Sequence, residues 1–487
     1  MPTERRETRK VTQCRSDSEI CADGFLKGYS RLHWIADRAA KPSAPKKMQQ
    51  LMHHFNATNL MRAFHSLHGN KAAGIDSVTK SEFKKNADEN IQALTLRIHE
   101  KKWFPKPSRE VLIPKSSGGT RALAVGCLED KVVQTLAARI LDAVFDARFH
   151  RHSFGFRPNK SAHMAVHTLY RAISKRSATC VVVEMDVEKF FDSMSHEWLM
   201  KRLEENIEDT HFLSLISRML KSSTLHGNGL LADNVVGTPQ GSPVSPILAN
   251  IYLHFLLDAW FQKNHAHEAD MVRYADDAVF VFDDMQKATQ FQAALKARMA
   301  EGSLSLNEAK SGITVFHEKS PQGIIPFLGF EFFWGVTRVN KRTLKVKTST
   351  KKLGKAIESF TDWVKAHRNK LPGTKLWRIA ASKVRGHLNY FGVVFNTVNV
   401  NNFHFGCLKS LFKWLNRRSQ KASFDYEAFK KKLHYLKFPL PPPGHLLKDI
   451  TSVSCLSVKP FPSSRMRKLR MSGSSRSVGR VSRPAFT

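Results

Sequence analysis

The sequence predicts an α+β domain followed by an all-α domain, and two observations support this prediction. Between residues 60 and 335, short apolar runs typical of strands, such as 180–187, are mixed with segments of helical periodicity. From about 350 to 421, apolar residues recur only at helical spacing. Because the helices and strands of the first part follow no repeating βα order, we expect an α+β domain there.

The composition points to a polyanionic partner. The chain has 487 residues, enough for about three domains of roughly 150 residues each. Lys and Arg number 77 against 42 Asp and Glu, which gives a formal net charge of +35. A globular protein with this excess repels itself unless a polyanion neutralises it, so nucleic acid is the expected partner. A cationic surface that serves solubility or ribosome-like packing is the alternative.

The cysteines and the termini indicate a reducing compartment. Six cysteines are scattered along the chain without a C-x-x-C pair, which argues against a disulfide framework and a structural zinc site. The charged N-terminus is unlike a secretory signal. The apolar stretch 243–261 contains Asn250, His254 and Asp258 and is interpreted as a buried helix. We therefore expect a soluble protein without a membrane span, in the bacterial cytoplasm or nucleoid.

The chain divides into four expected segments. They are a basic extension at 1–59, the mixed domain at 60–335, the helical domain at 350–440 and a basic tail at 441–487. A proline run at 439–443 ends the helical domain, and no acidic residue follows Asp449. We therefore expect the tail to be disordered until it meets RNA.

Adjacent carboxylates form the sharpest local signal. Asp276 and Asp277 follow Tyr274-Ala275 between two short apolar runs, so we expect them at the turn of a β-hairpin. Asp186 closes another β-rich run. Since side chains alternate along strands, only one of the adjacent acids can share a face with Asp186, and we expect Asp276 to be its close partner and Asp277 to be peripheral.

Such acids require a cation. Two Mg²⁺ ions held ~4 Å apart can activate a primer 3′-hydroxyl and steady a leaving pyrophosphate. Nucleotidyl transfer is the chemistry that this arrangement favours. The alternative for an isolated Asp-Asp turn is a solvated hairpin tip, because Asp is a common turn residue.

Further motifs favour the catalytic interpretation. Blocks occur in order at 113–121 (IPK and GGTR), 153–158 (SFGFRP), 186–192, 237–243 (GTPQGSP), 274–277 (YADD) and 327–330 (FLGF). Together they resemble the successive motifs of group II intron reverse transcriptases over roughly residues 60 to 335. The resemblance implies a right-hand polymerase fold with fingers and palm, in which Asp186, Asp276 and Asp277 match the metal-binding acids.

The resemblance also implies nucleotide-binding residues. Lys115 and Arg121 match basic finger residues that neutralise the incoming triphosphate. Phe191 matches the bulky residue that crowds the sugar 2′-position, so that a ribonucleotide clashes. Gln240 matches the residue that touches the nucleotide and the templating region. The alternatives are a charged hairpin surface for the cations and an ordinary core position for the aromatic ring.

The helical segment 350–421 is similar to the thumb of these enzymes, also called the maturase or X domain. This similarity implies binding of template–primer and of intron RNA, which is recognised mostly by shape and backbone. The candidate nucleic-acid-binding residues are Lys310, which matches a lysine of the polymerase domain, and Arg385, Lys409, Lys413, Arg417 and Arg418. The end of the chain lacks the Cys pairs of an appended HNH nuclease.

The sequence thus predicts an RNA-directed DNA polymerase that uses two Mg²⁺ ions, deoxynucleoside triphosphates and an RNA template with a DNA primer. The resemblance implies that it also binds group II intron RNA and assists splicing and mobility. A splicing-only RNA chaperone and a domesticated reverse transcriptase of phage defence are the alternatives. Oligomeric state stays open, with a homodimer among the options.

Overall fold

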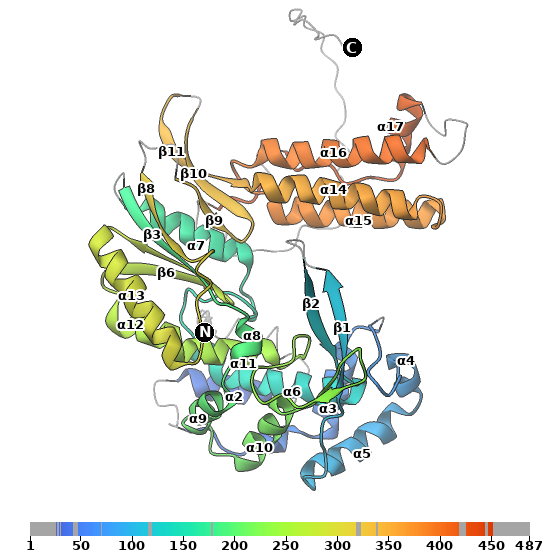
Figure 1. Cartoon of the computed structure of the whole chain (residues 1–487). Coiled ribbons are helices and arrows are strands. Elements are labelled where there is room, and N and C mark those ends of the chain that lie inside the picture. The colour runs from blue at the N-terminus through green and yellow to red at the C-terminus, as the bar shows by residue number, and fades with distance from the viewer. Residues whose placement is uncertain are drawn as a thin grey trace, which may run out of the picture.

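The computed structural model describes residues 26, 29, 31–41, 47–69, 71–114, 119–176, 179–317, 323–337, 339–417, 425–443 and 447–450. Helices and short strands mix irregularly up to residue 348, and only helices follow. The predicted α+β class is therefore confirmed. Figure 1 shows three sheets, a group of helices below them, and a long helical bundle to one side.

The first part of the chain builds a helical layer and a hairpin. Its helices are α2 (Leu32–Ala40), η1 (Leu51–His54), α3 (Ala57–Ser66), α4 (Lys80–Phe83), η2 (Lys84–Asn86) and α5 (Ala87–His99). The hairpin strands β1 (Ser108–Pro114) and β2 (Thr120–Val125) join β4 (Thr224–Leu225) and β5 (Leu231–Ala232) in a sheet of order β2-β1-β4-β5. Side-chain oxygens of Asn56 and Thr79 accept from backbone N–H groups and fix the starts of α3 and α4.

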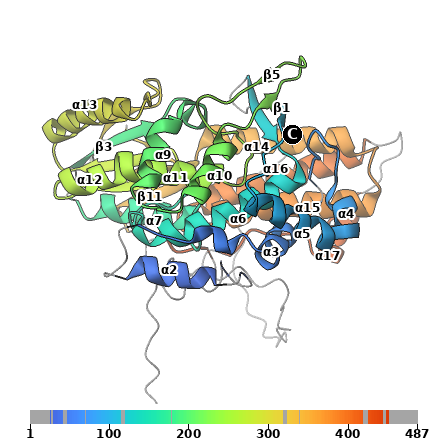
Figure 2. The same ribbon diagram turned by 90° about the horizontal axis from the view of Figure 1, so that it is seen from below.

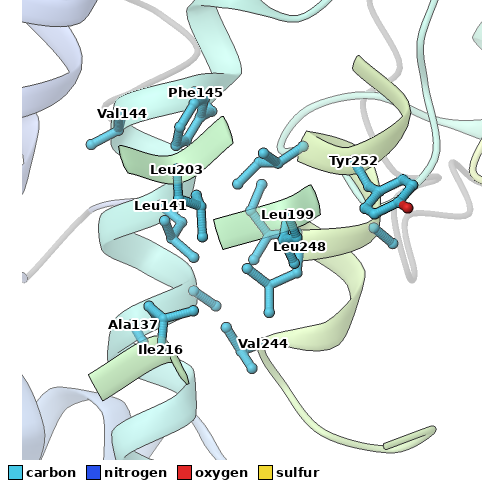
Figure 3. Close-up of a cluster of buried hydrophobic side chains, with 14 of the residues drawn as sticks. Ala137, Leu141, Val144, Phe145, Leu199, Leu203, Ile216, Val244, Leu248 and Tyr252 are labelled. Atoms are coloured by element: carbon cyan, nitrogen blue, oxygen red, sulfur yellow. The ribbon is translucent and has the colours of Figure 1, made fainter. Parts of the chain in front are cut away.

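The main core surrounds one nearly buried helix, α6 (Leu128–Phe145). The helices of this middle part are η3 (Asp146–Arg148), α7 (Ala162–Ser174), α8 (Phe190–Ser193), α9 (His196–Glu204), α10 (Thr210–Leu220), α11 (Ser245–Leu253), the π-helix η4 (His254–Asp258), α12 (Ala259–Asn264) and α13 (Met285–Glu301). Figure 3 shows side chains of α6, α9, α10 and α11 meeting in this core, Leu141 and Leu248 among them. The prediction of a buried helix within 243–261 is confirmed.

The central sheet packs against helices on both faces. Its antiparallel strands are β3 (Thr179–Asp186), β6 (Ala269–Tyr274), β7 (Asp277–Phe282) and β8 (Gly312–His317), in the order β6-β7-β3-β8. Alternation along β3 directs Val181 and Val183 into the core with α13, and Val182 into a second core with α7. Helices therefore cover both faces of the sheet that carries the acids.

A third sheet leads into the bundle. Strands β9 (Ile325–Phe327), β10 (Phe330–Val336) and β11 (Arg342–Thr348) pack on the second core. The helices α14 (Thr350–His367), α15 (Gly373–Phe391), α16 (Thr397–Leu415) and α17 (Tyr426–Tyr435) follow and enclose a core of their own. Figure 2 shows these helices from below, on the side of the molecule away from α12 and α13.

Parts of both terminal segments pack on the domains where the structure describes them. Helix α2, within the expected extension, packs on α6, and its Leu32 is fully buried. In the expected tail, Leu447 and Ile450 are buried, and the backbone oxygen of Ile450 lies 2.5 Å from Nδ1 of His167 on α7. The prediction of a disordered tail was therefore wrong for 447–450, while 451–487 lie outside the described residues.

Candidate functional site

The three predicted acids meet at one end of the central sheet. Asp186 is the last residue of β3, Asp277 is the first of β7, and Asp276 lies in the turn between β6 and β7. The register pairs Asp186 directly with Asp277. Asp277 is thus the cross-strand partner of Asp186, a place that the prediction gave to Asp276, and the charge of Asp186 acts on both acids. Strand alternation does not apply to Asp276, because the turn removes it from the ladder.

The acids repel one another electrostatically. Burial raises the pKa of Asp277 to about 7, and the charges of Asp276 and Asp186 add to the rise. Burial and Asp186 likewise raise the pKa of Asp276, which the Arg121 guanidinium opposes. Burial and the charge of Asp277 raise the pKa of Glu184, two residues before Asp186, to about 7. Four partly buried carboxyl groups thus gather here, and a bound cation would relieve their repulsion.

Lys310 partly supplies that positive charge. Its Nζ lies 2.9 Å from Oδ2 of Asp186, and its side chain is 64% exposed. Within the described ranges, no three His, Cys, Asp or Glu side chains are arranged to hold a metal ion as they stand. Carboxylate oxygens are the donors that Mg²⁺ prefers, so the donor set fits such an ion once Lys310 releases Asp186.

The turn between β6 and β7 is set by its neighbours. Ala275 has a left-handed φ of 58°. A Cβ at Gly155 would lie 2.3 Å from the Ala275 nitrogen, so only glycine fits there. The segment around Gly155 runs alongside β6, because the Phe154 N–H donates to the Arg273 carbonyl and the Arg273 N–H to the His152 carbonyl. The SFGFRP block therefore supports the acidic turn.

The GTPQGSP block packs on the segment that follows Asp186. The Thr238 N–H donates to the Phe191 carbonyl, and a Cβ at Gly237 (φ 81°) would lie 2.7 Å from the same oxygen. The Gln240 Nε2 donates to Oδ1 of Asp192 at 3.0 Å. These bonds hold Phe191 and Gln240, both half-buried, close to each other.

The same loop meets the β1–β2 hairpin. The Ala124 N–H of β2 donates to the Gln240 carbonyl at 2.7 Å. Arg121 is exposed on β2, near enough for its charge to oppose the rise in the pKa of Asp276. Lys115, predicted with Arg121, lies outside the described residues.

The 327–330 block forms a tight turn beneath the bundle. Leu328 and Gly329 both have positive φ, at 50° and 87°. The Tyr390 hydroxyl of α15 donates to the Leu328 carbonyl at 2.9 Å, and its ring stacks on Phe330. Burial raises the pKa of Tyr390 to about 12, and nearby Tyr274 and Asp277 add to this. The bundle therefore contacts the 327–330 turn through Tyr390, whose hydroxyl lies near enough to Asp277 for that charge to raise its pKa.

Cations gather on the bundle. Arg385 on α15 and Lys409 on α16 are exposed, whereas Arg418 lies outside the described residues. Four cations surround the half-buried ring of Trp414, at 4.8 to 5.7 Å from its centroid: Lys365, Arg368, Lys413 and Arg417. We call this group the Trp414 cluster. The structure thus describes five of the predicted nucleic-acid-binding residues. Four of them lie on the bundle, whereas Lys310 lies apart from these, beside Asp186.

Sequence reasoning missed several residues of the site. Tyr390 and Glu184 lie in segments whose motifs gave them no special signal. Lys352 on α14 lies against Gly329, and its charge opposes the rise in the pKa of Asp277. Arg273 precedes the YADD motif directly, and a charged residue inside an apolar strand could have drawn attention to it.

No helix in the described part of the chain is both long and apolar enough to span a membrane.

The comparisons with known proteins agree with these motifs. Residues 113–332 match the family described as reverse transcriptase (RNA-dependent DNA polymerase). A fission yeast protein, "Uncharacterized 91 kDa protein in cob intron", is 43% identical over 151 residues, 31% of this chain and 18% of that protein. Escherichia coli "Protein YkfC" is 29% identical over 269 residues, 49% of this chain and 70% of that protein.

A third relative carries a more informative name. The "Group II intron-encoded protein LtrA" of Lactococcus lactis is 31% identical over 195 residues, 40% of this chain and 32% of that protein. The chain thus covers less than a fifth of the fission yeast relative and about a third of the lactococcal one. The resemblance to intron-encoded reverse transcriptases that the ordered motifs predicted is confirmed.

Proposed function

We propose that the chain, whose residues 113–332 match the reverse transcriptase family, copies RNA into DNA by two-metal nucleotidyl transfer and assists a group II intron. Reverse transcriptases use divalent metal ions. The observation that carries the proposal is the convergence of Asp186, Asp276 and Asp277 at one end of the central sheet.

In this proposal the molecule has the right-hand fold of a polymerase. The palm is the central sheet with its helices, the fingers are the β1–β2 hairpin and the N-terminal helices, and the thumb is the bundle α14–α17. Two observations support the arrangement: the charge of Arg121 in the fingers opposes the rise in the pKa of Asp276, and the Tyr390 hydroxyl of the thumb donates to the Leu328 carbonyl. Template and primer would lie between these parts (Figure 1).

The three acids would hold two Mg²⁺ ions, which when bound activate the primer 3′-hydroxyl and stabilise the leaving pyrophosphate. Asp186 first exchanges its ion pair with Lys310 for this role. The freed ammonium group can then neutralise a phosphate of the nucleic acid, as the sequence predicted for Lys310. This exchange requires little energy, because an exposed ion pair contributes about 0 to 1 kcal/mol.

Four further residues would bind and orient the incoming nucleotide. Lys115 and Arg121 neutralise the triphosphate, and Phe191 excludes a 2′-hydroxyl. Gln240 positions the base pair, with its side chain held in place through Asp192. Because the Gln240 carbonyl also accepts from β2 of the fingers, the fingers and the nucleotide loop are linked.

The thumb would bind RNA through the Trp414 cluster together with Arg385, Lys409 and Arg418. Exposed cations neutralise phosphates, and the RNA supplies the chemistry of splicing. This part of the proposal draws on the relative named a group II intron-encoded protein, so the expected partners are intron RNA and an RNA template with a DNA primer.

Primer extension tests the proposal. The protein is given a DNA primer on an RNA template, Mg²⁺ and deoxynucleotides, and is compared with Asp276→Ala and Asp277→Ala. Each variant should lose at least roughly a hundredfold in rate, because charge that develops in the transition state is no longer stabilised. Template–primer binding, measured by fluorescence anisotropy, should be retained.

Asp362→Ala serves as the matched control. Asp362 is an exposed acid of α14 whose ion pair with Lys365 lies on the surface, so its loss should leave extension unchanged. A natural protein that extends no primer, yet accelerates intron splicing, would replace the polymerase proposal with a splicing chaperone.

A further inference from the structure

A fully buried ion pair lies behind the acidic turn. Arg273, near the end of β6, donates from Nε to Oδ1 of Asp258 at 2.7 Å and from Nη2 to Oδ2 at 2.5 Å. Both side chains have 0% exposure. Asp258 is the last residue of the π-helix η4, and such helical irregularities are frequent at functional sites. The pair therefore ties the strand that leads into the turn to the helix behind it.

The remaining nitrogen of Arg273 reaches the turn itself. Its Nη1 donates to the Ala275 carbonyl at 2.9 Å and to Oδ1 of Asn250 at 3.2 Å. Asn250 in turn donates from Nδ2 to the Gly155 carbonyl at 2.8 Å. The two chain segments that meet at the turn, around Gly155 and around Ala275, are thus both bonded to one buried polar network.

The Ala275 carbonyl belongs to the peptide unit that leads into Asp276. Because a peptide unit is planar, fixing its oxygen also fixes the direction in which the chain enters Asp276. Ala275 holds a left-handed conformation, which is unfavourable for a residue with a Cβ and needs support from its surroundings. Repulsion among the three acids acts on the same turn in the absence of a cation. The Arg273 bond opposes both tendencies.

Stability alone does not account for this network. A buried ion pair is weak evidence for stability, because removing two charges from water costs about as much as their attraction returns. Replacing such a pair with apolar side chains is often neutral. What apolar side chains cannot replace is the directional bond from Nη1 to the Ala275 carbonyl.

We propose that Arg273 and Asp258 are positioning residues that set the geometry of Asp276 and Asp277 and thereby the affinity of the site for divalent cations. Asp258 holds the guanidinium plane, and Arg273 transmits that orientation to the turn. The inference rests on the proposed function only in its assignment of the three acids as cation ligands.

The test uses the full chain with Arg273→Met and Asp258→Leu combined. This double variant removes both charges together, so no unpaired charge is left in the core. Mn²⁺ binding is followed by electron paramagnetic resonance, and thermal unfolding is measured beside it. We expect a cooperatively folded protein whose Mn²⁺ affinity falls on the order of tenfold, as for residues that orient metal ligands. An unchanged affinity would overturn the inference.

A matched control lies at the far end of the same hairpin. Arg176, with 8% of its side chain exposed, pairs with Asp270 on β6 at 2.7 Å and donates to the Val281 carbonyl of β7 at 2.6 Å. The double variant Arg176→Met with Asp270→Leu removes an ion pair that ties the same two strands to the segment after α7. It should lower the melting temperature and leave Mn²⁺ affinity unchanged. If both double variants weakened Mn²⁺ binding equally, the effect would be general loosening and the inference would fail.

Arg273→Lys keeps the inference testable if the double variant does not fold. A lysine can keep the charge pair with Asp258, but one ammonium group cannot reproduce the planar fork that also reaches Ala275. Mn²⁺ affinity should therefore fall while the fold is kept. An affinity equal to that of the natural protein would count against the inference.

The two proposals fail in different ways. A natural protein that binds Mn²⁺ at the acids but extends no primer contradicts the polymerase and leaves the positioning pair intact. A natural protein that binds no Mn²⁺ overturns the positioning inference directly. Normal extension and unaltered Mn²⁺ binding in the Arg273 variants would overturn the positioning pair alone.

Discussion

At the β6–β7 turn, polar side chains are buried and bonded to one another, whereas on the bundle the charged side chains are exposed and surround an aromatic ring. Arg273 and Asp258 are fully buried behind the turn, while Lys413 and Arg417 reach Trp414 from the surface. A directional network holds a few atoms in one geometry, and an exposed cluster only accumulates charge. Single substitutions at the turn should therefore have large effects on activity, and single substitutions on the bundle should have small effects on RNA affinity.

Gly155→Ala, which adds only one methyl group, should give the largest loss in the rate of primer extension. The added Cβ would lie 2.3 Å from the Ala275 nitrogen, so the turn that carries Asp276 must move. A displacement of about 1 Å at a reacting centre can cost roughly a hundredfold in rate. Primer extension measures the loss, and template–primer binding should change little. Gly386→Ala, on α15 with open space around its Cβ, is the control.

The next effect is a pH dependence of stability at the turn. The pKa of Asp277 is raised to about 7, so the folded state holds the proton more tightly than the unfolded chain does. Without metal, Asp277 therefore lowers stability as pH rises from about 4 to about 7. Asp277→Asn should raise the melting temperature of the metal-free protein at pH 8 and not at pH 4.

Thermal unfolding across this pH range measures the effect, which should be on the order of 1 kcal/mol or more. Removal of the Asp277 charge also relieves Glu184, whose pKa it helps to raise, and this acts in the same direction. Equal melting temperatures for the variant and the natural protein at pH 8 would contradict the buried repulsion. In the natural protein, Mn²⁺ should bind more weakly as pH falls below 7, because protons compete for the carboxylates.

Tyr390→Phe probes the contact between the bundle and the 327–330 turn. It removes the hydroxyl that donates to the Leu328 carbonyl and keeps the ring on Phe330. One lost hydrogen bond corresponds to about 0.5–1.5 kcal/mol, so the catalytic rate should fall by roughly 2- to 10-fold. Steady-state extension should place the effect in kcat or in the KM for primer–template, with RNA binding by the bundle unchanged. An intact rate would mean that this contact contributes nothing to DNA synthesis.

The sequence was sufficient for the parts that lie close together along the chain. The acids at the turn and at the end of β3 follow from short motifs, and the α+β class follows from periodicity. The partnership of Asp186 with Asp277 was missed, because it depends on whether Asp276 belongs to the strand or to the turn. A shift of one residue reverses which side chains share a face.

Other features depend on contacts that no local pattern encodes. Arg273 meets Asp258 across 15 positions, at the end of the π-helix η4, and no periodicity in the sequence predicts that helix. Tyr390 reaches Leu328 across 62 positions, and His167 contacts Ile450 across 283. The same reason explains why 447–450 was expected to be disordered: its burial depends on a surface formed by α7 and α15, not on its own composition.

The smallest effect should come from single cations of the bundle. Lys413→Ala removes one of the four cations around Trp414, and the remaining three keep the surface positive. RNA affinity should fall only a few-fold, and the slope of log affinity against log salt should decrease by about 1, the value for one lost phosphate contact. Lys287→Ala, a substitution at an exposed lysine of α13 away from the bundle, should leave the slope unchanged. If Lys413→Ala instead abolished RNA binding with no change in slope, the bundle would share the directional character of the turn, and the contrast between the two regions would fail.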